Sequence, residues 1–162
     1  FGLFSAPSLA LEVAPAAEDP IAVGTLDAWF QAPEKTTVSP LQMALVAATL
    51  TNDGYQPAPK LANSYQDENG NWIAFGQSTT QQQILDSAVA FRIRERLIAE
   101  KQAIWYQVGH ANIADDEPLT WYIGGTTPEW TGTPLAIAIA IEGSQPALAL
   151  QIGSALLNPA AP

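Results

Sequence analysis

Few residues in this sequence carry side chains that can do covalent chemistry. The chain has one histidine, His110, and no cysteine among its 162 residues. Disulfides, thiolate metal sites and cysteine nucleophiles are therefore excluded. A catalytic triad needs a base oriented by a further group, and a zinc site needs several ligands. A lone histidine supplies neither, so we interpret His110 as a strand residue at the edge of a sheet.

A serine nucleophile needs a base close by, and one well-known solution is a lysine three residues later on the same helix, S-x-x-K. None of the three lysines follows a serine at that spacing. The residues three positions before Lys35, Lys60 and Lys101 are Ala32, Pro57 and Ile98. No serine is followed two residues later by asparagine, and no lysine begins K-T-G or K-S-G. The sequence therefore predicts no catalytic residue.

Two other groups of side chains suggest binding sites. The run Asp115-Asp116-Glu117 offers oxygens to a hard cation, but an acidic hairpin turn is the commoner meaning, and we predict no metal and no cofactor. Tryptophan faces can stack on the apolar faces of sugars, although most tryptophans are core or rim residues of a sheet. The five tryptophans are Trp29, Trp72, Trp105, Trp121 and Trp130.

The charge balance restricts the partners. Sixteen acidic residues against six basic ones give a net charge of −10, which opposes binding to a phosphate backbone, so we expect no nucleic acid. Four of the six cations fall between residues 92 and 101, with Glu95 and Glu100 among them. We interpret that cluster as a solvated helix face.

The length and the 48% hydrophobic content indicate one globular domain over residues 1–162. Residues 1–35 are rich in proline and carboxylates without a regular period and are predicted to be an extended wrapping segment, while residues 36–162 hold the helices and the sheet. No stretch reaches the length of a membrane span. The chain opens with Phe1 rather than methionine, and we expect that any signal or anchor lies upstream in a longer parent.

The patterning predicts three helices and a small sheet. A first helix begins at Ser39-Pro40, a hairpin turns at Asn69-Gly70, and a second helix over 86–100 has an apolar stripe of Val89, Ile93 and Leu97 with arginines on its other face. The predicted strands are Ala103–Ala111, Leu119–Thr126 and Leu135–Glu142. Because the last of these is apolar almost throughout, helices should cover both of its faces. The stripe of the last helix is Leu148, Ile152, Ala155 and Leu156.

The segment Val38–Gly54, VSPLQMALVAATLTNDG, resembles the helix of penicillin-binding transpeptidases usually written T-P-L-Q-M-A…A-N-G-G. Residues 121–124, WYIG, are similar to the W-F-x-G strand of that family, and the order of helices, hairpin and strands is the same. The resemblance covers almost all of the chain. It implies an α+β fold with a small three- to five-stranded antiparallel sheet packed with helices, as in the C-terminal part of the transpeptidase and serine β-lactamase fold.

The resemblance also implies where a site would lie. The K-T-G strand of the family falls on Ala103–Ala111, where residues 107–111, QVGHA, stand against K-T-G-T-A. Gln107 then replaces the lysine cation and Val108 the following hydroxyl, which normally hold the substrate carboxylate or shuttle protons. Gly109 is kept, and His110 matches a residue whose backbone N–H belongs to the oxyanion hole. We expect a vestigial groove at Gln107, Val108, Gly109 and His110.

We therefore predict a non-catalytic, extracytoplasmic transpeptidase-like domain with a structural or binding role in peptidoglycan biology. In the family, this half forms one wall of the groove that receives the D-alanyl-D-alanine end of cell-wall peptides. One alternative is the C-terminal half of an active D,D-transpeptidase whose serine and lysine motifs lie upstream. Another is a peptidoglycan- or carbohydrate-binding module. The expected partners are the upstream part of a parent chain, another cell-envelope protein, a peptidoglycan peptide, or a second copy through an exposed sheet edge.

Overall fold

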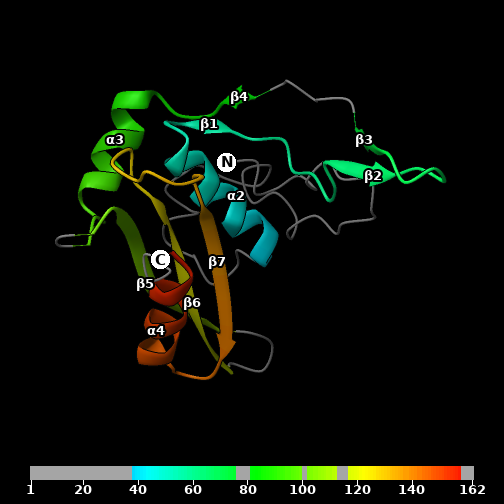
Figure 1. The fold of residues 1–162 in the computed structure, drawn as a ribbon. Coiled ribbons are helices and arrows are strands. Elements are labelled where there is room, and N and C mark those ends of the chain that lie inside the picture. Colours follow the sequence, from blue (N-terminus) through cyan, green and yellow to red (C-terminus); the bar gives the residue numbers. More distant parts are fainter. Residues whose placement is uncertain (1–37, 76–80, 100–101, 113–116, 158–162) are drawn as a thin grey trace, which may run out of the picture.

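The computed structural model describes residues 38–75, 81–99, 102–112 and 117–157. The predicted wrapping segment 1–35 and the acidic residues 115–116 lie outside these ranges. At the centre of the described part is an antiparallel meander of three strands in the order β5–β6–β7 (Figure 1). They are β5 (Ile104–Asn112), β6 (Pro118–Thr126) and β7 (Ala136–Glu142). Each boundary lies within one residue of its predicted position, and the α+β class is confirmed.

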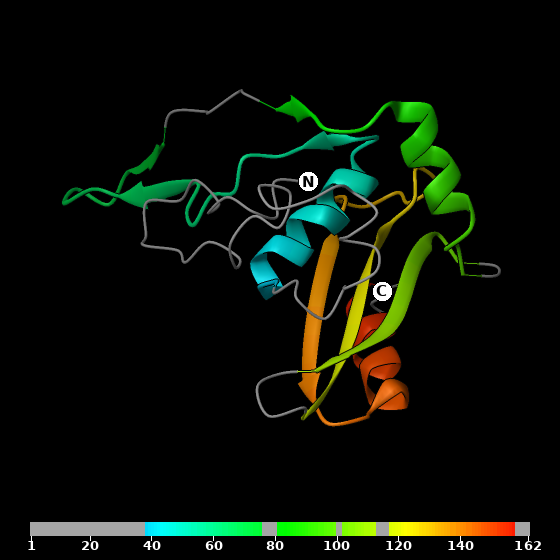
Figure 2. The same cartoon turned by 180° about the vertical axis from the view of Figure 1, so that it is seen from behind.

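Two helices cover opposite faces of this sheet, α2 (Pro40–Thr51) and α4 (Pro146–Leu157) (Figures 1 and 2). Isoleucine and alanine alternate along β7, so each kind of side chain faces one of the two helices. Its isoleucines pack with Ala149 and Leu157 of α4, whereas Ala136 packs with Ala47 and Leu50 of α2. Small side chains on the α2 face let that helix approach the strand closely. The prediction of helices on both faces is therefore confirmed.

Helix α2 begins where the sequence predicted. The Ser39 hydroxyl accepts from the Gln42 N–H at 3.2 Å, and the Gln42 side chain accepts from the Ser39 N–H at 2.8 Å, which together form a capping box. Pro40 occupies the first helical position, where its missing N–H costs nothing. The start of α2 is thus held in place, which matters because it borders the groove described below.

The predicted hairpin consists of β2 (Ser64–Gln66) and β3 (Trp72–Ala74) and projects away from the sheet (Figure 1). Its turn differs in detail from a two-residue Asn-Gly turn. Gly70 has φ 83, while Asn69 is not left-handed, and Asp67 accepts from the backbone N–H groups of Asn69 and Asn71 at 2.9 and 2.8 Å. A second pair, β1 (Tyr55–Gln56) with β4 (Gln82–Gln83), leads back toward the sheet.

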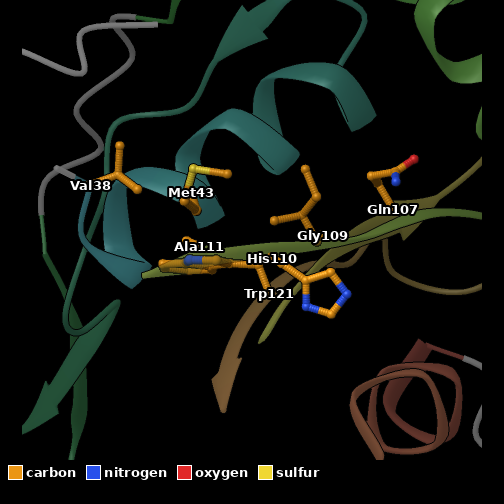
Figure 3. Close-up of a pocket in the computed structure, with 8 residues that line it drawn as sticks. Val38, Met43, Gln107, Gly109, His110, Ala111 and Trp121 are labelled. Carbon is orange, nitrogen blue, oxygen red and sulfur yellow. The ribbon is translucent and has the colours of Figure 1, made fainter. Parts of the chain in front are cut away.

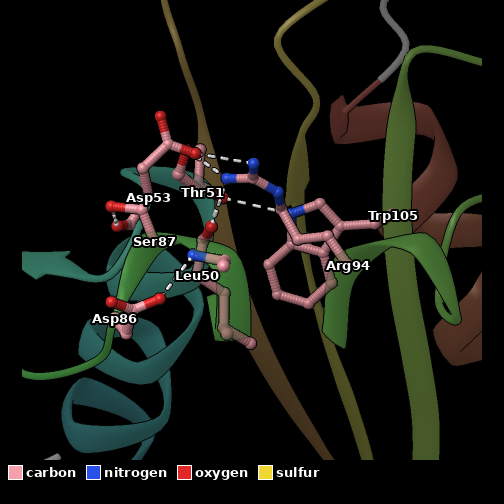
Figure 4. A network of polar contacts seen from close by, with 8 residues as sticks. Leu50, Thr51, Asp53, Asp86, Ser87, Arg94 and Trp105 are labelled. Atoms are coloured by element: carbon pink, nitrogen blue, oxygen red, sulfur yellow. Dashed lines mark hydrogen bonds and ion pairs between the residues drawn. The ribbon is translucent and has the colours of Figure 1, made fainter. Parts of the chain in front are cut away.

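Helix α3 (Ser87–Glu95) is capped by Asp86 and is shorter than predicted. The expectation that all its arginines face solvent is wrong for Arg94, whose side chain is only 4% exposed. Its guanidinium donates to the carbonyl oxygens of Leu50 and Thr51 at 2.7 and 3.2 Å and to Asp53 at 2.6 Å (Figure 4). Arg94 thus satisfies carbonyls at the end of α2, where a helix leaves them unpaired.

The predicted stripe of α4 is also wrong. Leu148, Ile152 and Leu156 are exposed, and the side of the helix that faces the sheet carries Ala149, Gly153 and Leu157. A β-carbon on Gly153 would overlap the ring of Tyr122 on β6. Only a glycine therefore fits at the position of α4 that contacts the tyrosine ring.

The outer edge of β7 has no partner strand within the described ranges. In the same ranges, no helix is long and apolar enough to pass through a bilayer.

Candidate functional site

A shallow groove lies between the start of α2 and the face of β5 and β6 that this helix covers (Figure 3). Its volume is about 260 Å³. Its lining is mostly apolar and comes from Val38, Met43, Gln107, Gly109, His110, Ala111, Trp121 and Ile123. Three of the four residues predicted for a vestigial groove are in this lining, so the structure brings that stretch of β5 to a cavity.

Successive side chains of β5 point to opposite faces of the sheet, so only some of the predicted side chains can reach the groove. Ile104, Tyr106 and Val108 belong to the cluster packed under α4, so the side chain of Val108 lies on the far face of the sheet. His110 lies two residues after Val108, so its side chain is on the same far face of the sheet, and its imidazole points away from Met43 (Figure 3). It therefore contributes only backbone to the groove, whereas the Gln107 side chain and the Gly109 backbone face it.

Gln107 is held by its own strand. Its side-chain Nε2 donates to the Val108 carbonyl oxygen at 2.8 Å. Because that carbonyl can only accept, the nitrogen of the amide must face it, and the oxygen Oε1 is left to face outward. The second N–H of Nε2 is not used by this bond, so the site presents a neutral amide with one donor and one acceptor at the place where the resemblance implies a cation.

The outer edge of β5 runs along the groove. The Tyr106 N–H donates to the Leu97 carbonyl at 3.1 Å and the Ile104 carbonyl accepts from Ala99 at 3.0 Å, so even-numbered residues of this strand point their backbone groups away from β6. The next outward groups are those of Val108 and His110. Within the described ranges, the N–H groups of both and the His110 carbonyl have no protein partner.

Gly109 forms the open floor of the groove. A β-carbon added there would meet no atom within 4 Å, and the residue is not in the left-handed region. The glycine is therefore not required by backbone conformation, and the space above it is available to a ligand.

None of the described residues that line the groove is a lysine, arginine, aspartate or glutamate. In the part of the chain that the structure describes, no group of three or more His, Asp or Glu is arranged to hold a metal ion. The groove can therefore offer apolar contact, the oxygen and one N–H of the Gln107 amide, and backbone hydrogen bonds.

Sequence reasoning missed the apolar lining. Trp121 and Ile123 share a face with Gly109 because they alternate on the neighbouring strand, and Gly109 is registered opposite Trp121. The predicted strands, with an assumed register between them, would have placed these three residues on one face of the sheet. Met43 could not have been placed, because no local pattern shows which turn of α2 lies over β5.

No known family profile and no curated protein matches this sequence. Solved structures do match. Penicillin-binding protein A from M. tuberculosis, in an imipenem acyl-enzyme complex, is 25% identical with a TM-score of 0.74 over 98% of this chain and 39% of its own. The D,D-transpeptidase domain of a peptidoglycan glycosyltransferase from Eggerthella lenta is 18% identical with a TM-score of 0.68, over 96% of this chain and 45% of its own.

A peptidoglycan synthetase from Bifidobacterium adolescentis is 14% identical with a TM-score of 0.70, over 98% of this chain and 34% of its own. The predicted resemblance to penicillin-binding transpeptidase domains is confirmed at the level of the fold and over nearly the whole chain. The chain spans less than half of the length of each of these three structures.

Proposed function

We propose that this chain, which has the fold of part of a penicillin-binding transpeptidase domain, is a non-catalytic relative that binds a peptide in the cell envelope. The observation that carries the proposal is the state of Gln107. Its side chain is a neutral amide, which supplies neither the positive charge nor the mobile proton that acyl transfer needs at this place.

The test uses fluorescent penicillin, which forms a covalent adduct with an activated serine. We expect no labelling of the 162-residue chain and none of its parent protein, with penicillin-binding protein A from M. tuberculosis as the positive control, since it forms a penicillin G acyl-enzyme. A serine adduct located by mass spectrometry in the parent would overturn the proposal.

A second candidate is that this chain is one part of an active D,D-transpeptidase whose serine, lysine and asparagine lie upstream or on another chain. Its support is that the chain covers only 39% of a structure that is an acyl-enzyme. Reading the upstream coding sequence for S-x-x-K and S-x-N separates the two candidates. Restoring the cation with Gln107→Lys should then raise the rate of penicillin acylation of the parent, whereas a non-catalytic parent gains none.

The carbohydrate-binding alternative has little support from the tryptophans. Trp105 is fully buried, and Trp72 is 71% exposed on the projecting hairpin. Trp121 and Trp130 are half-buried, so Trp72 is the only fully exposed tryptophan of the described ranges on which a sugar could stack. Titration with glycan fragments that carry no peptide should leave the tryptophan fluorescence unchanged, and a saturable change that Trp72→Ala removes would revive this alternative.

A further inference from the structure

We infer that Asn69 is a site of spontaneous covalent modification, where the side-chain amide converts to a carboxylate through a cyclic imide formed with Gly70. Both residues are exposed at the turn of the projecting hairpin β2–β3 (Figure 1). They lie outside the groove, so this site is independent of the proposed function. Three features carry the inference: the residue after Asn69, the unbonded side chain of Asn69, and the hydrogen bonds of the turn.

The reaction needs a backbone nitrogen that can reach the asparagine side chain. The sequence has six asparagines, and Asn69 is the only one followed by glycine. A side chain on the following residue hinders the approach of its nitrogen to Cγ of the asparagine, and glycine has none. The space around Gly70 is also open, because an added β-carbon would have only the end of the Gln66 side chain within 4 Å.

The reaction also needs an asparagine side chain that is free to turn toward that nitrogen. Asn71, on the same turn, does not meet this condition, because its side-chain nitrogen donates to the Asp67 carboxylate at 3.2 Å. In the described ranges the side chain of Asn69 has no such bond, and only its backbone N–H donates, to Asp67 at 2.9 Å. Asn69 can therefore rotate its side chain without breaking a hydrogen bond of the hairpin.

The overall reaction consumes water and releases ammonia. The Gly70 nitrogen loses its proton and attacks Cγ of Asn69, the new C–N bond closes a cyclic imide, and the side-chain nitrogen leaves as ammonia with that proton. Water then opens the ring. If the bond to Cγ breaks, residue 69 becomes an ordinary aspartate. If the bond to the backbone carbonyl carbon breaks, it becomes isoaspartate, whose main chain runs through the former side chain.

The folded turn slows the reaction. The Gly70 N–H donates to the Asp67 carbonyl oxygen at 3.0 Å, so the attacking nitrogen is free only when the turn opens. Opening is local, because β2 and β3 have three residues each and a hairpin of this size is only marginally stable by itself. We therefore expect Asn69 to convert in the folded chain, but more slowly than in the unfolded chain.

Isoaspartate at residue 69 would disturb the hairpin more than aspartate would. Its longer main chain displaces the Asn71 N–H, which donates to Asp67 Oδ1 at 2.8 Å, and places a second carboxylate beside Asp67. Across the strands, the ring centroids of Tyr65 and Phe75 are 5.2 Å apart, and this contact depends on the register of the hairpin. Formation of isoaspartate should therefore loosen the pairing of β2 with β3.

Incubation of the 162-residue chain at pH 7, 8 and 9, followed by peptide mapping in a mass spectrometer, tests the inference. We expect the peptide that contains Asn69 to gain the mass difference between an amide and a carboxyl group, and an isoaspartyl methyltransferase to label it. The rate should rise about tenfold per pH unit, because the attacking nitrogen must lose its proton. Fragmentation of the peptide should show Asn71 unchanged.

Two variants separate the chemistry of the residue pair from the mobility of the turn. Asp67→Ala removes an acceptor of the turn and should speed the conversion by about fivefold, the factor that one hydrogen bond supports. Gly70→Ala should suppress the conversion, although alanine at a φ of 83 also loosens the turn. Gly143→Ala, at a glycine with a φ of 88 outside the hairpin, is the matched control and should leave the rate unchanged.

An unmodified Asn69 in the folded chain at pH 9, after a time in which the urea-unfolded chain has converted, would overturn the inference. So would a conversion that Gly70→Ala leaves as fast as before, because the nitrogen of residue 70 would then not be the attacking group.

Discussion

Arg94 of α3 donates from Nη1 to the carbonyl oxygen of Leu50, near the end of α2, at 2.7 Å (Figure 4). The same guanidinium reaches Thr51 O and Asp53. Asp53 is 60% exposed in its side chain, so the ion pair itself contributes little. The bonds to buried carbonyls connect α3 to the helix that borders the groove.

We expect Arg94→Ala to lower the free energy of unfolding by about 3 kcal/mol, because it leaves buried carbonyls without donors and removes a packed side chain. Arg94→Lys should recover less than half of this loss, since an ammonium cannot reproduce the planar fork. Urea unfolding followed by circular dichroism measures both. Arg92→Ala is the matched control: that arginine is exposed and bonds within its own helix, so a change within about 0.5 kcal/mol is expected. Equal losses for the two arginines would refute the role assigned to Arg94.

Sequence patterns predicted the elements well where a local signal determines them, as with the capped start of α2 at Ser39 and the alternation of β7. They failed where a tertiary contact decides between neighbouring faces of a helix. Arg94 is next to the predicted stripe of α3 and is buried because carbonyls of α2 need a donor. On α4, the large residues Leu148 and Ile152 made the stronger pattern, but the Tyr122 ring leaves room only for Gly153.

Tertiary contacts also limit how much of the candidate site could be predicted from the sequence. Gln107 and Gly109 were predicted from a resemblance and do face the groove. The Gln107 contact with Val108 depends on a side-chain rotamer, and the contribution of Met43 depends on how α2 lies over the sheet. Neither has a signature in the local sequence.

Ser39→Ala should destabilise the chain by about 1 kcal/mol, the usual cost of losing a helix N-cap. Since Val38 and Met43 flank this cap and line the groove, affinity for a peptide bound in the groove should fall as well. Asp86→Ala removes the N-cap of α3 instead and should cost a similar amount without changing peptide affinity. Thermal unfolding and a peptide titration give the two readouts, and an unchanged affinity in the Ser39 variant would argue against a groove positioned by α2.

Gly153→Ala should destabilise the chain by about 2 kcal/mol, because the new methyl group would overlap the Tyr122 ring. Helix propensity alone predicts a gain of about 1 kcal/mol for the same change, so the sign of the effect is informative. Gly109→Ala, where nothing lies within 4 Å of the added carbon, should be close to neutral. A stabilised Gly153 variant in urea unfolding would mean that α4 does not pack on β6 as described.

The burial of Tyr122 predicts that the stability of the fold depends on pH in the alkaline range. Its side chain is fully buried, its hydroxyl has no hydrogen-bond partner in the described ranges, and burial raises its pKa from 10.0 to about 12. The nearby Ser154 reduces this rise in the pKa but does not reach hydrogen-bonding geometry. Between pH 10 and 12 the unfolded chain releases the proton that the folded chain keeps, so stability should fall by about 1.4 kcal/mol per pH unit in that window.

The variant Tyr122→Phe isolates this effect from the other groups that titrate at high pH. At pH 7 it should be neutral or stabilising by about 1 kcal/mol, because it removes a buried hydroxyl that lacks a partner. The free energy of unfolding from urea titrations at pH 8, 10 and 11 should decline less steeply for the variant than for the parent chain. Parallel declines would show that the hydroxyl is solvated in the folded state.

The outer edge of β7, which has no partner strand in the part of the chain that the structure describes, predicts self-association. The outward backbone groups are those of Ala136, Ala138, Ala140 and Glu142, because the odd residues of this strand pair with β6. Glu142 is the one charge of the strand and lies at its end, while the three alanines carry none of the charges that usually block edge pairing. We expect the 162-residue chain to form a dimer at micromolar concentration in sedimentation equilibrium. Ala140→Lys should return it to the monomer, because a lysine on the edge opposes strand addition, whereas Gln145→Lys, exposed beyond the end of the strand, should leave the dimer intact. A wild-type chain that stays monomeric at those concentrations would mean that this edge does not pair with a second copy.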